Sequence, residues 1–356
     1  MDNRSRREFI KSMLAVEAAL YALGGKAFAQ RAPGQETAAR GEKQVAPGME
    51  RRQFGKTDMK VSALGFGTAE IGWRRTDQAT VDKLLNLALD TGLNVIDTAA
   101  SYWGAEESIG KAVAHRRDEY LVFTKAGHVV NDEIAWYKGW LDEDITRGID
   151  RSLRRLKTDR VDMVHLHSCD LATLERGEAI EALEKARKAG KTRYIGYSGD
   201  NAAALWAVES GHFDSLMTSI NIADQQAIEL TLPIARKKQM GVLTKRTLAN
   251  AAWIHRSAKD APAPEIKTYW ERLQKLEYEF LSWWAKRVRG SNPFEIALRF
   301  PISLPGVHTA VFGSANPDHI RQNAEFVKAG PLPKNMLDAI RARWKAVAGE
   351  DWVGVV

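Results

Sequence analysis

The feature that most constrains the fold of this 356-residue chain is a regular alternation of short apolar runs with longer amphipathic segments. The short runs have the length and composition of buried strands. There are eight of them, at Val61–Gly65, Asn94–Asp97, Tyr120–Lys125, Val161–His167, Arg193–Tyr197, Ser215–Asn221, Gly241–Lys245 and His308–Gly313. Strands that alternate with helices are typical of parallel sheets, so the pattern predicts an α/β fold.

The segments between these runs carry the apolar spacing of amphipathic helices. Examples are Val81, Leu84, Leu85 and Ala88 before Gly92, Ile149, Leu153 and Leu156, and Ala179, Ile180, Leu183 and Ala186 before Gly190. Eight strands and their helices over about 300 residues predict a single-domain (β/α)8 TIM barrel. A doubly wound sheet is the alternative, but Gly65-Phe66-Gly67 lacks the third glycine of a dinucleotide-binding turn.

Composition excludes several classes of protein. Hydrophobic residues make up 44% and charged residues 27%, as in ordinary globular domains, and no run reaches the roughly 20 apolar residues of a membrane span. The single cysteine, Cys169, excludes intrachain disulfides and multi-thiolate metal sites. The net charge of +7 would suit a polyanion partner, but no basic block of five or six residues follows the N-terminal segment, so we expect no nucleic-acid partner.

The N-terminal segment has the layout of an export signal. A basic stretch precedes the mostly apolar run from Leu14 to Leu23, and Ala27-Phe28-Ala29 offers a small-x-small cleavage site. The run from Ser5 to Lys11 resembles a twin-arginine (Tat) signal, which implies Tat export machinery as a partner and a periplasmic location. The alternative is an amphipathic helix of a cytoplasmic protein. We therefore predict a signal peptide at 1–29, a disordered linker at 30–48 and the barrel at 49–350.

The loop after the seventh strand, residues 246–290, is long enough to contain a helix of its own. Its apolar residues Tyr269, Leu273, Leu276, Phe280 and Trp283 have heptad-like spacing. The loop would rise from the face of the barrel where active sites form, so we predict a lid over cofactor or substrate.

Four polar residues at or just after successive strand ends are the candidate catalytic residues: Asp97, Tyr102, Lys125 and His167. Neighbouring strand ends in a barrel lie about 4.8 Å apart, so these groups are expected at one mouth. A phenol with a pKa near 10 is a weak acid at neutral pH, and an ammonium about 4 Å away favours the phenolate by up to roughly 4 kcal/mol before burial is counted. Asp97 would hold Lys125, and His167 would donate to the substrate oxygen. The set fits carbonyl reduction by a nicotinamide.

At these residues the chain resembles the aldo/keto reductase family, from about Met49 to about Lys328. The segments that carry the resemblance are Leu64-Gly65-Phe66-Gly67-Thr68, Asp97-Thr98-Ala99-Ala100-Ser101-Tyr102, Glu106-Glu107-Ser108-Ile109-Gly110-Lys111-Ala112, Phe123-Thr124-Lys125, Asp159 to His167, Arg193 to Ser198, and Gly313-Ser314-Ala315-Asn316-Pro317. Their common order and spacing make the resemblance specific. It implies that Asp97, Tyr102, Lys125 and His167 form the family's tetrad, with Tyr102 as the acid and no metal.

The resemblance also implies NADPH bound in extended form across the barrel mouth. The residues that it assigns to the cofactor are Gly67, Thr68, Asp97, Ser198, Lys245, Leu248, Gly313, Ser314, Asn316, His319, Gln322 and Asn323. The helix that begins after Gly313 would offer its N-terminus to the 2′-phosphate.

Four positions depart from the family pattern. The usual Ser-Asn is Ser198-Gly199, the usual Gln of strand six is Met217, and Lys245 with its neighbours replaces an aromatic residue after strand seven. His319 stands where an arginine is frequent, so NADP(H) is the expected cofactor and NAD(H) stays an alternative.

Each functional interpretation has a plainer alternative. Asp97 and Lys125 could be a structural ion pair, and Tyr102 a packing aromatic. His165 and His167 share a strand face, but later strands offer no further metal ligand, so His165 is expected to be a hydrogen-bonded interior residue. Cys169 has no base to activate it.

Two further alternatives concern acidic and aromatic side chains. Glu106 and Glu107 could suggest a glycosidase, but adjacent helical residues point apart and fit the first turn of a helix better. Trp73, Trp103, Trp136 and Trp140 lie in predicted loops at the catalytic face. They would either cover the core or form an apolar substrate pocket, for which we single out Trp73, Trp103 and Trp136.

Two functions stay open. The first is an exported NADP-dependent reductase that converts an aldehyde, ketone or sugar-like carbonyl to an alcohol. The second is a nicotinamide-nucleotide-binding sensor with slow or absent turnover, which export would favour because free NADPH is expected to be scarce outside the cytoplasm. An intact tetrad favours the enzyme, since a sensor has no use for a tuned acid.

Overall fold

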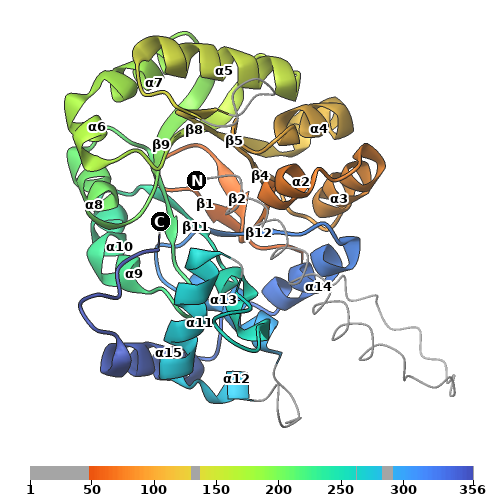
Figure 1. The fold of residues 1–356 in the computed structure, drawn as a ribbon. Coiled ribbons are helices and arrows are strands. Elements are labelled where there is room, and N and C mark those ends of the chain that lie inside the picture. Colours follow the sequence, from red (N-terminus) through yellow and green to blue (C-terminus); the bar gives the residue numbers. More distant parts are fainter. Residues whose placement is uncertain (1–47, 130–136, 262, 283–291, 356) are drawn as a thin grey trace, which may run out of the picture.

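The computed structural model describes residues 48–129, 137–261, 263–282 and 292–355. Within them, eight parallel strands close into a barrel with helices around it (Figure 1). The barrel strands are β3 (Leu64–Gly67), β4 (Val95–Asp97), β5 (Leu121–Ala126), β8 (Val161–His167), β9 (Thr192–Ser198), β10 (Ser215–Ser219), β11 (Gly241–Lys245) and β12 (Thr309–Gly313). Each strand pairs with the next and β12 pairs with β3, so the predicted (β/α)8 barrel is confirmed and the doubly wound alternative is wrong.

Helices cover the outside of the barrel and the ends of its loops. They are α2 (Ala69–Arg74), α3 (Gln78–Asp90), α4 (Ala105–Ala112), α5 (Asp142–Leu156), α6 (Leu171–Arg176), α7 (Glu178–Lys188), α8 (Asn201–Ser210), α9 (Gln226–Leu230), α10 (Leu232–Lys237), α11 (Pro264–Leu276), α12 (Glu279–Ser282), α13 (Pro293–Ile302), α14 (Pro317–Lys328) and α15 (Lys334–Val347). Short 3₁₀ helices span Ala114–Glu119 and Ala249–Ile254. None of the helices in the described part of the chain has the length and apolar character needed to cross a membrane.

Helix α3 shows how local sequence sets these elements. The Asp77 side chain accepts a hydrogen bond from the Thr80 amide and caps the N-terminus. The predicted stripe of Val81, Leu84, Leu85 and Ala88 is buried against the barrel. Gly92 follows the helix with a φ of +94°, a left-handed conformation that glycine adopts without strain.

The predicted first strand, Val61–Gly65, is divided in the structure. Lys60–Ser62 forms β2, which pairs antiparallel with β1 (Arg51–Gln53), and the barrel strand β3 begins only at Leu64. The break has a local cause, because the Ser62 hydroxyl donates to the Leu64 carbonyl and the Ser62 amide donates to Asn94. One apolar run thus serves two different sheets.

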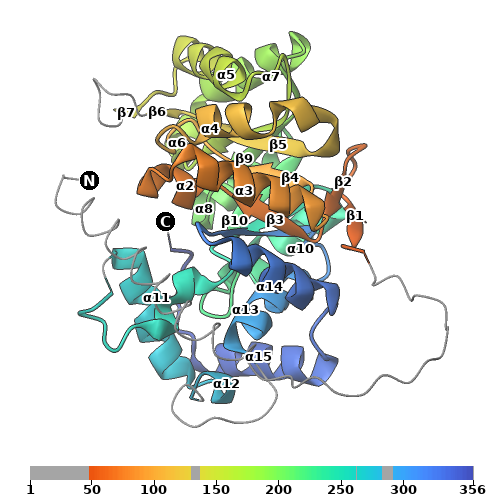
Figure 2. The same ribbon diagram turned by 90° about the vertical axis from the view of Figure 1, so that its right-hand side faces the viewer.

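The β1–β2 hairpin closes one end of the barrel. Phe54, Met59 and Val61 are buried among side chains from inside the barrel, including Phe123 and Met163. Figure 2 shows the hairpin at one end and α11 with the small β6–β7 hairpin (His128–Val129 and Tyr137–Lys138) at the other. The hairpin therefore leaves only the opposite mouth for a site.

In its described residues, the long loop after β11 forms the 3₁₀ helix Ala249–Ile254 and two α-helices, α11 and α12, rather than a single helix. Helix α11 buries Tyr269, Leu273 and Leu276, as the heptad-like spacing predicts. The chain then turns at Glu277, whose φ is +44°, and Phe280 lies in the separate helix α12. Trp283 lies outside the described residues. Because of this turn, the residues before and after it belong to two helices, not to the one continuous helix that the heptad-like spacing predicts.

Candidate active site

The carboxyl ends of the barrel strands supply the candidate catalytic side chains. Asp97 is the last residue of β4, His167 is the last residue of β8, and Lys125 is next to last in β5. Tyr102 lies in the loop between β4 and α4. Parallel strands bring these ends to one mouth of the barrel, opposite the β1–β2 hairpin.

Lys125 and Asp97 form a buried ion pair. The Lys125 ammonium donates to both carboxylate oxygens of Asp97 and to the Thr98 carbonyl, each at 2.8 Å. The two side chains are 1% and 4% exposed. Burial lowers the pKa of Lys125, but Asp97 and Tyr102 together outweigh burial and raise it. The ammonium therefore keeps its charge beside the cavity.

The Tyr102 ring lies next to the Lys125 ammonium. Its ring centre is 4.9 Å from Lys125 Nζ, 6.0 Å from the His167 ring and 6.4 Å from Trp73. Burial raises the pKa of the phenol above its usual value, and the Lys125 charge offsets only part of this effect. The expected acidification is thus wrong for the protein alone, because desolvation of the phenolate is the larger effect. Tyr102 keeps its proton at neutral pH.

His167 is uncharged in this setting. Burial lowers its pKa well below the usual value, and the nearby His128, Lys125, Lys245 and His165 lower it further. Its Nδ1 lies 3.4 Å from the Ser101 hydroxyl. A neutral imidazole can still donate one hydrogen bond, which is the role that the sequence assigned to it.

The four side chains line one cavity of about 320 Å³ at the barrel mouth. Other predicted site residues that line it are Gly67, Trp73, Ser198, Lys245, Leu248 and Gly313. Residues that the sequence did not single out for the site also line it, among them Glu70, Arg246, Asn250, Glu265 and Ile266. Glu265 and Ile266 belong to α11, so the first turn of the predicted lid reaches the cavity.

Two cations form the side of the cavity at the end of β11. The Lys245 ammonium lies 2.8 Å from the buried Asp200 carboxylate, and Arg246 lies 3.8 Å from it. Burial opposes ionisation of Asp200, but the two cations outweigh burial and lower its pKa. Asp200 was not among the site residues predicted from sequence. Its position just after Ser198-Gly199, at the end of β9, could have indicated that it lies at the barrel mouth.

The remaining predicted cofactor residues lie beside the cavity rather than on it. Ser314 and Asn316 contact the two ring nitrogens of His319, at 2.9 Å and 3.3 Å. Asn316 also caps α14 by accepting from the Asp318 amide, while Gln322 and Asn323 lie further along that helix. This group borders the cavity through Gly313, which lines it.

The comparisons with known proteins agree with this geometry. The model of the aldo/keto reductase family matches residues 63–345. The chain belongs to the aldo/keto reductase family.

Its relatives cover most of the chain. The uncharacterized oxidoreductase YqkF of Bacillus subtilis (strain 168) is 26% identical over 309 residues, which are 83% of this chain and 97% of YqkF. L-galactose dehydrogenase of Arabidopsis thaliana is 27% identical over 299 residues, or 78% and 88%. The solved structure of aldo-keto reductase AKR11C1 from Bacillus halodurans, in its holo form, has a TM-score of 0.72 and 27% identity, covering 85% and 99%. The chain is thus an oxidoreductase of this family.

Two predicted residues of this aldo/keto reductase do not line the cavity, and a third is not described. Thr68 is fully buried, and its hydroxyl donates to the Asp97 carbonyl, so it supports β4 rather than lining the cavity. Trp103 packs against the Arg75 guanidinium and is not among the lining residues. Trp136 lies outside the described residues.

The plainer interpretations of His165, Glu106 and Glu107 are confirmed. His165 is fully buried, its Nε2 lies 2.8 Å from the Ser215 hydroxyl, and burial lowers its pKa to about 3. Burial raises the pKa of the Cys169 thiol to about 12. Glu106 and Glu107 lie in the first turn of α4. Over the described ranges, no cluster of three His, Cys, Asp or Glu side chains could hold a metal ion.

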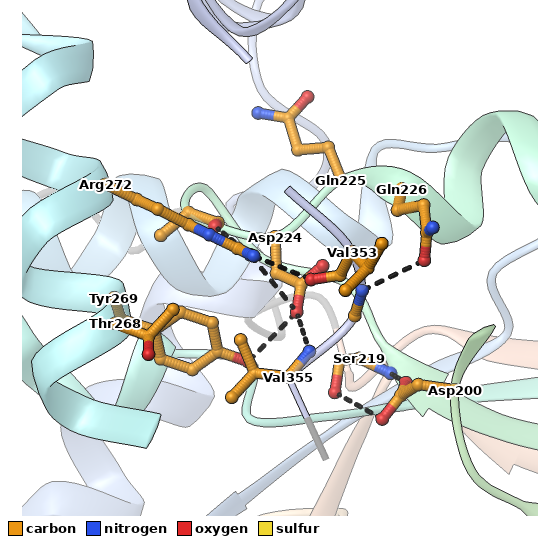
Figure 3. A network of polar contacts seen from close by, with 12 residues as sticks. Asp200, Ser219, Asp224, Gln225, Gln226, Thr268, Tyr269, Arg272, Val353 and Val355 are labelled. Atoms are coloured by element: carbon orange, nitrogen blue, oxygen red, sulfur yellow. Dashed lines mark hydrogen bonds and ion pairs between the residues drawn. The ribbon is translucent and has the colours of Figure 1, made fainter. Parts of the chain in front are cut away.

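A polar network joins the lid to the end of the chain (Figure 3). The Asp224 carboxylate accepts from the Tyr269 hydroxyl of α11 at 3.2 Å and from the Val355 amide at 3.1 Å. Arg272 of α11 donates to the Val353 carbonyl at 2.7 Å, and Arg246 donates to the Val355 carbonyl. The described chain thus continues past residue 350. Its residue Val355 contacts Arg246, a cation that lines the cavity.

Proposed function

We propose that this aldo/keto reductase uses NADP(H) to reduce an aldehyde, ketone or sugar-like carbonyl to an alcohol, with Tyr102 as the general acid. The observation that carries the proposal is the protonated Tyr102 phenol between a buried, charged Lys125 and an uncharged His167, on one cavity. A proton donor, a charge that stabilises its conjugate base and a second hydrogen-bond donor are what carbonyl reduction requires of a protein.

The cavity fits a nicotinamide nucleotide. Gly67 and Gly313 lie side by side in β3 and β12 and both line the cavity, so no side chain of theirs stands between the backbone and a ligand there. Lys245 and Arg246 supply positive charge for phosphate groups, and the N-terminus of α14 lies next to Gly313. When bound, the reduced nicotinamide supplies the hydride that goes to the carbonyl carbon. NAD(H) is the alternative nucleotide, because His319 stands where family members frequently have an arginine, whose charge is permanent.

The side chains then have separate tasks. Tyr102 transfers its hydroxyl proton to the carbonyl oxygen, which gains the electron pair of the C=O bond as hydride reaches the carbon. The Lys125 ammonium stabilises the phenolate left on Tyr102, by an amount of order 4 kcal/mol at about 4 Å and an effective dielectric near 20. His167 donates a hydrogen bond to the same oxygen, and Asp97 fixes Lys125. Solvent returns a proton to Tyr102 after the alcohol leaves.

A sugar-like substrate has specific support in the wall of the cavity. Trp73 is half-buried beside Tyr102 and lines the cavity, and an indole face suits the C–H face of a sugar ring. L-galactose dehydrogenase, a curated relative, acts on a sugar according to its name. We therefore favour sugar-like aldehydes and their alcohols within the broader carbonyl class.

The replacement Tyr102→Phe tests the proposal. The variant should bind NADPH with unchanged affinity in a fluorescence titration, because the ring stays in place. It should lose turnover by about 100-fold or more on any carbonyl that the wild type reduces, because the proton donor is gone. A Tyr102→Phe enzyme that reduces such a carbonyl as fast as wild type would refute the assignment.

We also propose that the enzyme acts in the periplasm. The support is the twin-arginine pattern from Ser5 to Lys11 and the cleavage pattern at Ala27-Phe28-Ala29. Both lie outside the described residues. Export of a folded chain would suit an enzyme that encloses its cofactor before leaving the cytoplasm.

A further inference from the structure

A second imidazole lies directly behind the candidate hydrogen-bond donor of the site. His128 follows β5 by two residues and begins β6. Its ring centre is 4.8 Å from that of His167, and the planes are inclined by 39°. His128 is buried and does not line the cavity. Its contact with the site therefore runs through His167.

The local backbone is built to place this ring. Gly127 has a φ of +101°, and a side chain there would lie 1.8 Å from the Trp140 ring. The Gly139 amide donates to the Gly127 carbonyl at 2.8 Å, which holds the two arms of the β6–β7 hairpin together. Trp140 also packs against His128, with ring centres 5.2 Å apart. His128 thus contacts both Trp140 and His167.

We propose that His128 is a positioning residue for His167, whose ring it keeps uncharged and fixed edge-on to Tyr102. The Tyr102 and His167 rings meet at 84°, and the other partner of His167 is the Ser101 hydroxyl at 3.4 Å, a long contact for a hydrogen bond. The His128 ring packs against the imidazole at a tilt and occupies space that water would otherwise fill on that side. Loss of this water weakens the stabilisation of the charged form of His167.

Four titratable groups around His167 lower its pKa: His128 on β6, Lys125 on β5, His165 on β8 and Lys245 on β11. Tyr102, in the loop before α4, also faces His167, with its ring edge-on. The two lysines are cations that repel an imidazolium, and both are anchored to carboxylates. Of the two described rings that pack against His167, the His128 ring is the nearer, at 4.8 Å against 6.0 Å for Tyr102.

The inference deepens the proposed function, since it concerns the group that polarises the carbonyl, but its main test does not depend on turnover. In protein labelled at histidine Cε1, NMR gives the pKa of His167, and the His167→Gln variant assigns its signal. In wild type, the pKa of His167 should lie well below the usual value, so the ring should stay neutral as the pH falls through 6.5. In His128→Ala its pKa should rise toward the usual value of about 6.5.

Matched variants distinguish the effect of losing the ring contact from a general loss of structure. His128→Phe keeps an aromatic ring and should keep the low His167 pKa, while His128→Gln, polar and without a ring, should behave as His128→Ala. Exposed His115, in the 3₁₀ helix Ala114–Glu119, is the control, and His115→Ala should leave the His167 titration unchanged. A His167 pKa that is the same in wild type, His128→Ala and His128→Gln would overturn the proposal. So would a rise in His128→Phe as large as that in His128→Ala.

Kinetics give a second measure. On a carbonyl that the wild type reduces, kcat/KM of His128→Ala should fall about tenfold between pH 7.5 and pH 5.5 as His167 becomes charged, a fall that wild type lacks. A flat profile for the variant would contradict the inference. Failure of the Tyr102→Phe test would instead refute the general acid and leave the His167 titration standing.

Discussion

Each lysine at the cavity is held by a buried carboxylate. Lys125 is paired with Asp97, and Lys245 with Asp200, at 2.8 Å in both cases. Asp200 also accepts from the Thr218 hydroxyl and the Ser219 amide, so its carboxylate is tied to β10 as well. A charge buried with a partner becomes costly when the partner is removed. The charges of the site are therefore part of the stability of the barrel.

We expect Asp200→Asn to lower the free energy of unfolding by roughly 3 kcal/mol, because Lys245 would stay buried without a counter-charge. Urea unfolding followed by circular dichroism measures this. The double variant Asp200→Asn with Lys245→Met should regain part of the loss, since it buries no unpaired ammonium. A single variant as stable as wild type would show that water solvates Lys245 at no cost.

At the scale of elements, one carboxylate joins the lid to the chain end. Asp224 lies between β10 and α9 and contacts Tyr269 and Arg272 of α11 and the Val355 amide (Figure 3). Burial, followed by the nearby Asp200 charge, raises the pKa of Asp224 to about 7. The folded protein thus binds this proton more tightly than the unfolded chain, where an aspartate has a pKa near 3.9.

Stability from this site should be full below about pH 4 and should be lost as the pH rises through 7. Relative to Asp224→Asn, which cannot ionise, the wild type should lose up to about 1.4 kcal/mol of unfolding free energy per pH unit between pH 5 and pH 7. Urea unfolding at several pH values measures the difference. Exposed Asp118 gives the control, since Asp118→Asn should show a constant difference. A constant difference for Asp224→Asn as well would contradict the prediction.

At the scale of the whole molecule, the barrel has one closed end and one open end. The β1–β2 hairpin fills the closed end with Phe54 and Met59, while α11 and the β6–β7 hairpin surround the mouth (Figure 2). The cavity is assembled from strands that span the whole barrel, from β3 to β12. A cofactor can therefore be enclosed only after the barrel has closed, which would suit the proposed export of an already folded chain.

The proposed export route has a direct test at this scale. Replacing Arg6 and Arg7 together by lysine should leave the enzyme in the cytoplasm, because the twin-arginine pair is the part of the signal that its machinery reads. Immunoblots of periplasmic and cytoplasmic fractions measure the distribution. Equal periplasmic recovery of the double variant and wild type would refute export by this route.

Much of the site could be predicted from sequence, because the period of the apolar pattern sets the strands, and parallel strands place their carboxyl ends together. Asp97, Lys125 and His167 follow from this rule, since each stands at or next to a strand end. The rule fails at Val61–Gly65, where two strands of different sheets share one apolar run, and at Glu277, where the helical phase breaks.

Only the tertiary structure determines the protonation states of the site and the residues that contact its side chains from outside the cavity. The sequence predicts an ammonium near Tyr102, but only the fold shows that burial of the phenol is the larger effect on its pKa. Asp200 contacts Lys245 and His128 contacts His167 across gaps in sequence that no periodicity links. The physical reason is that the period of the apolar pattern indicates which side of a helix or strand is buried. Desolvation and charge pairing depend instead on which other elements pack against that side.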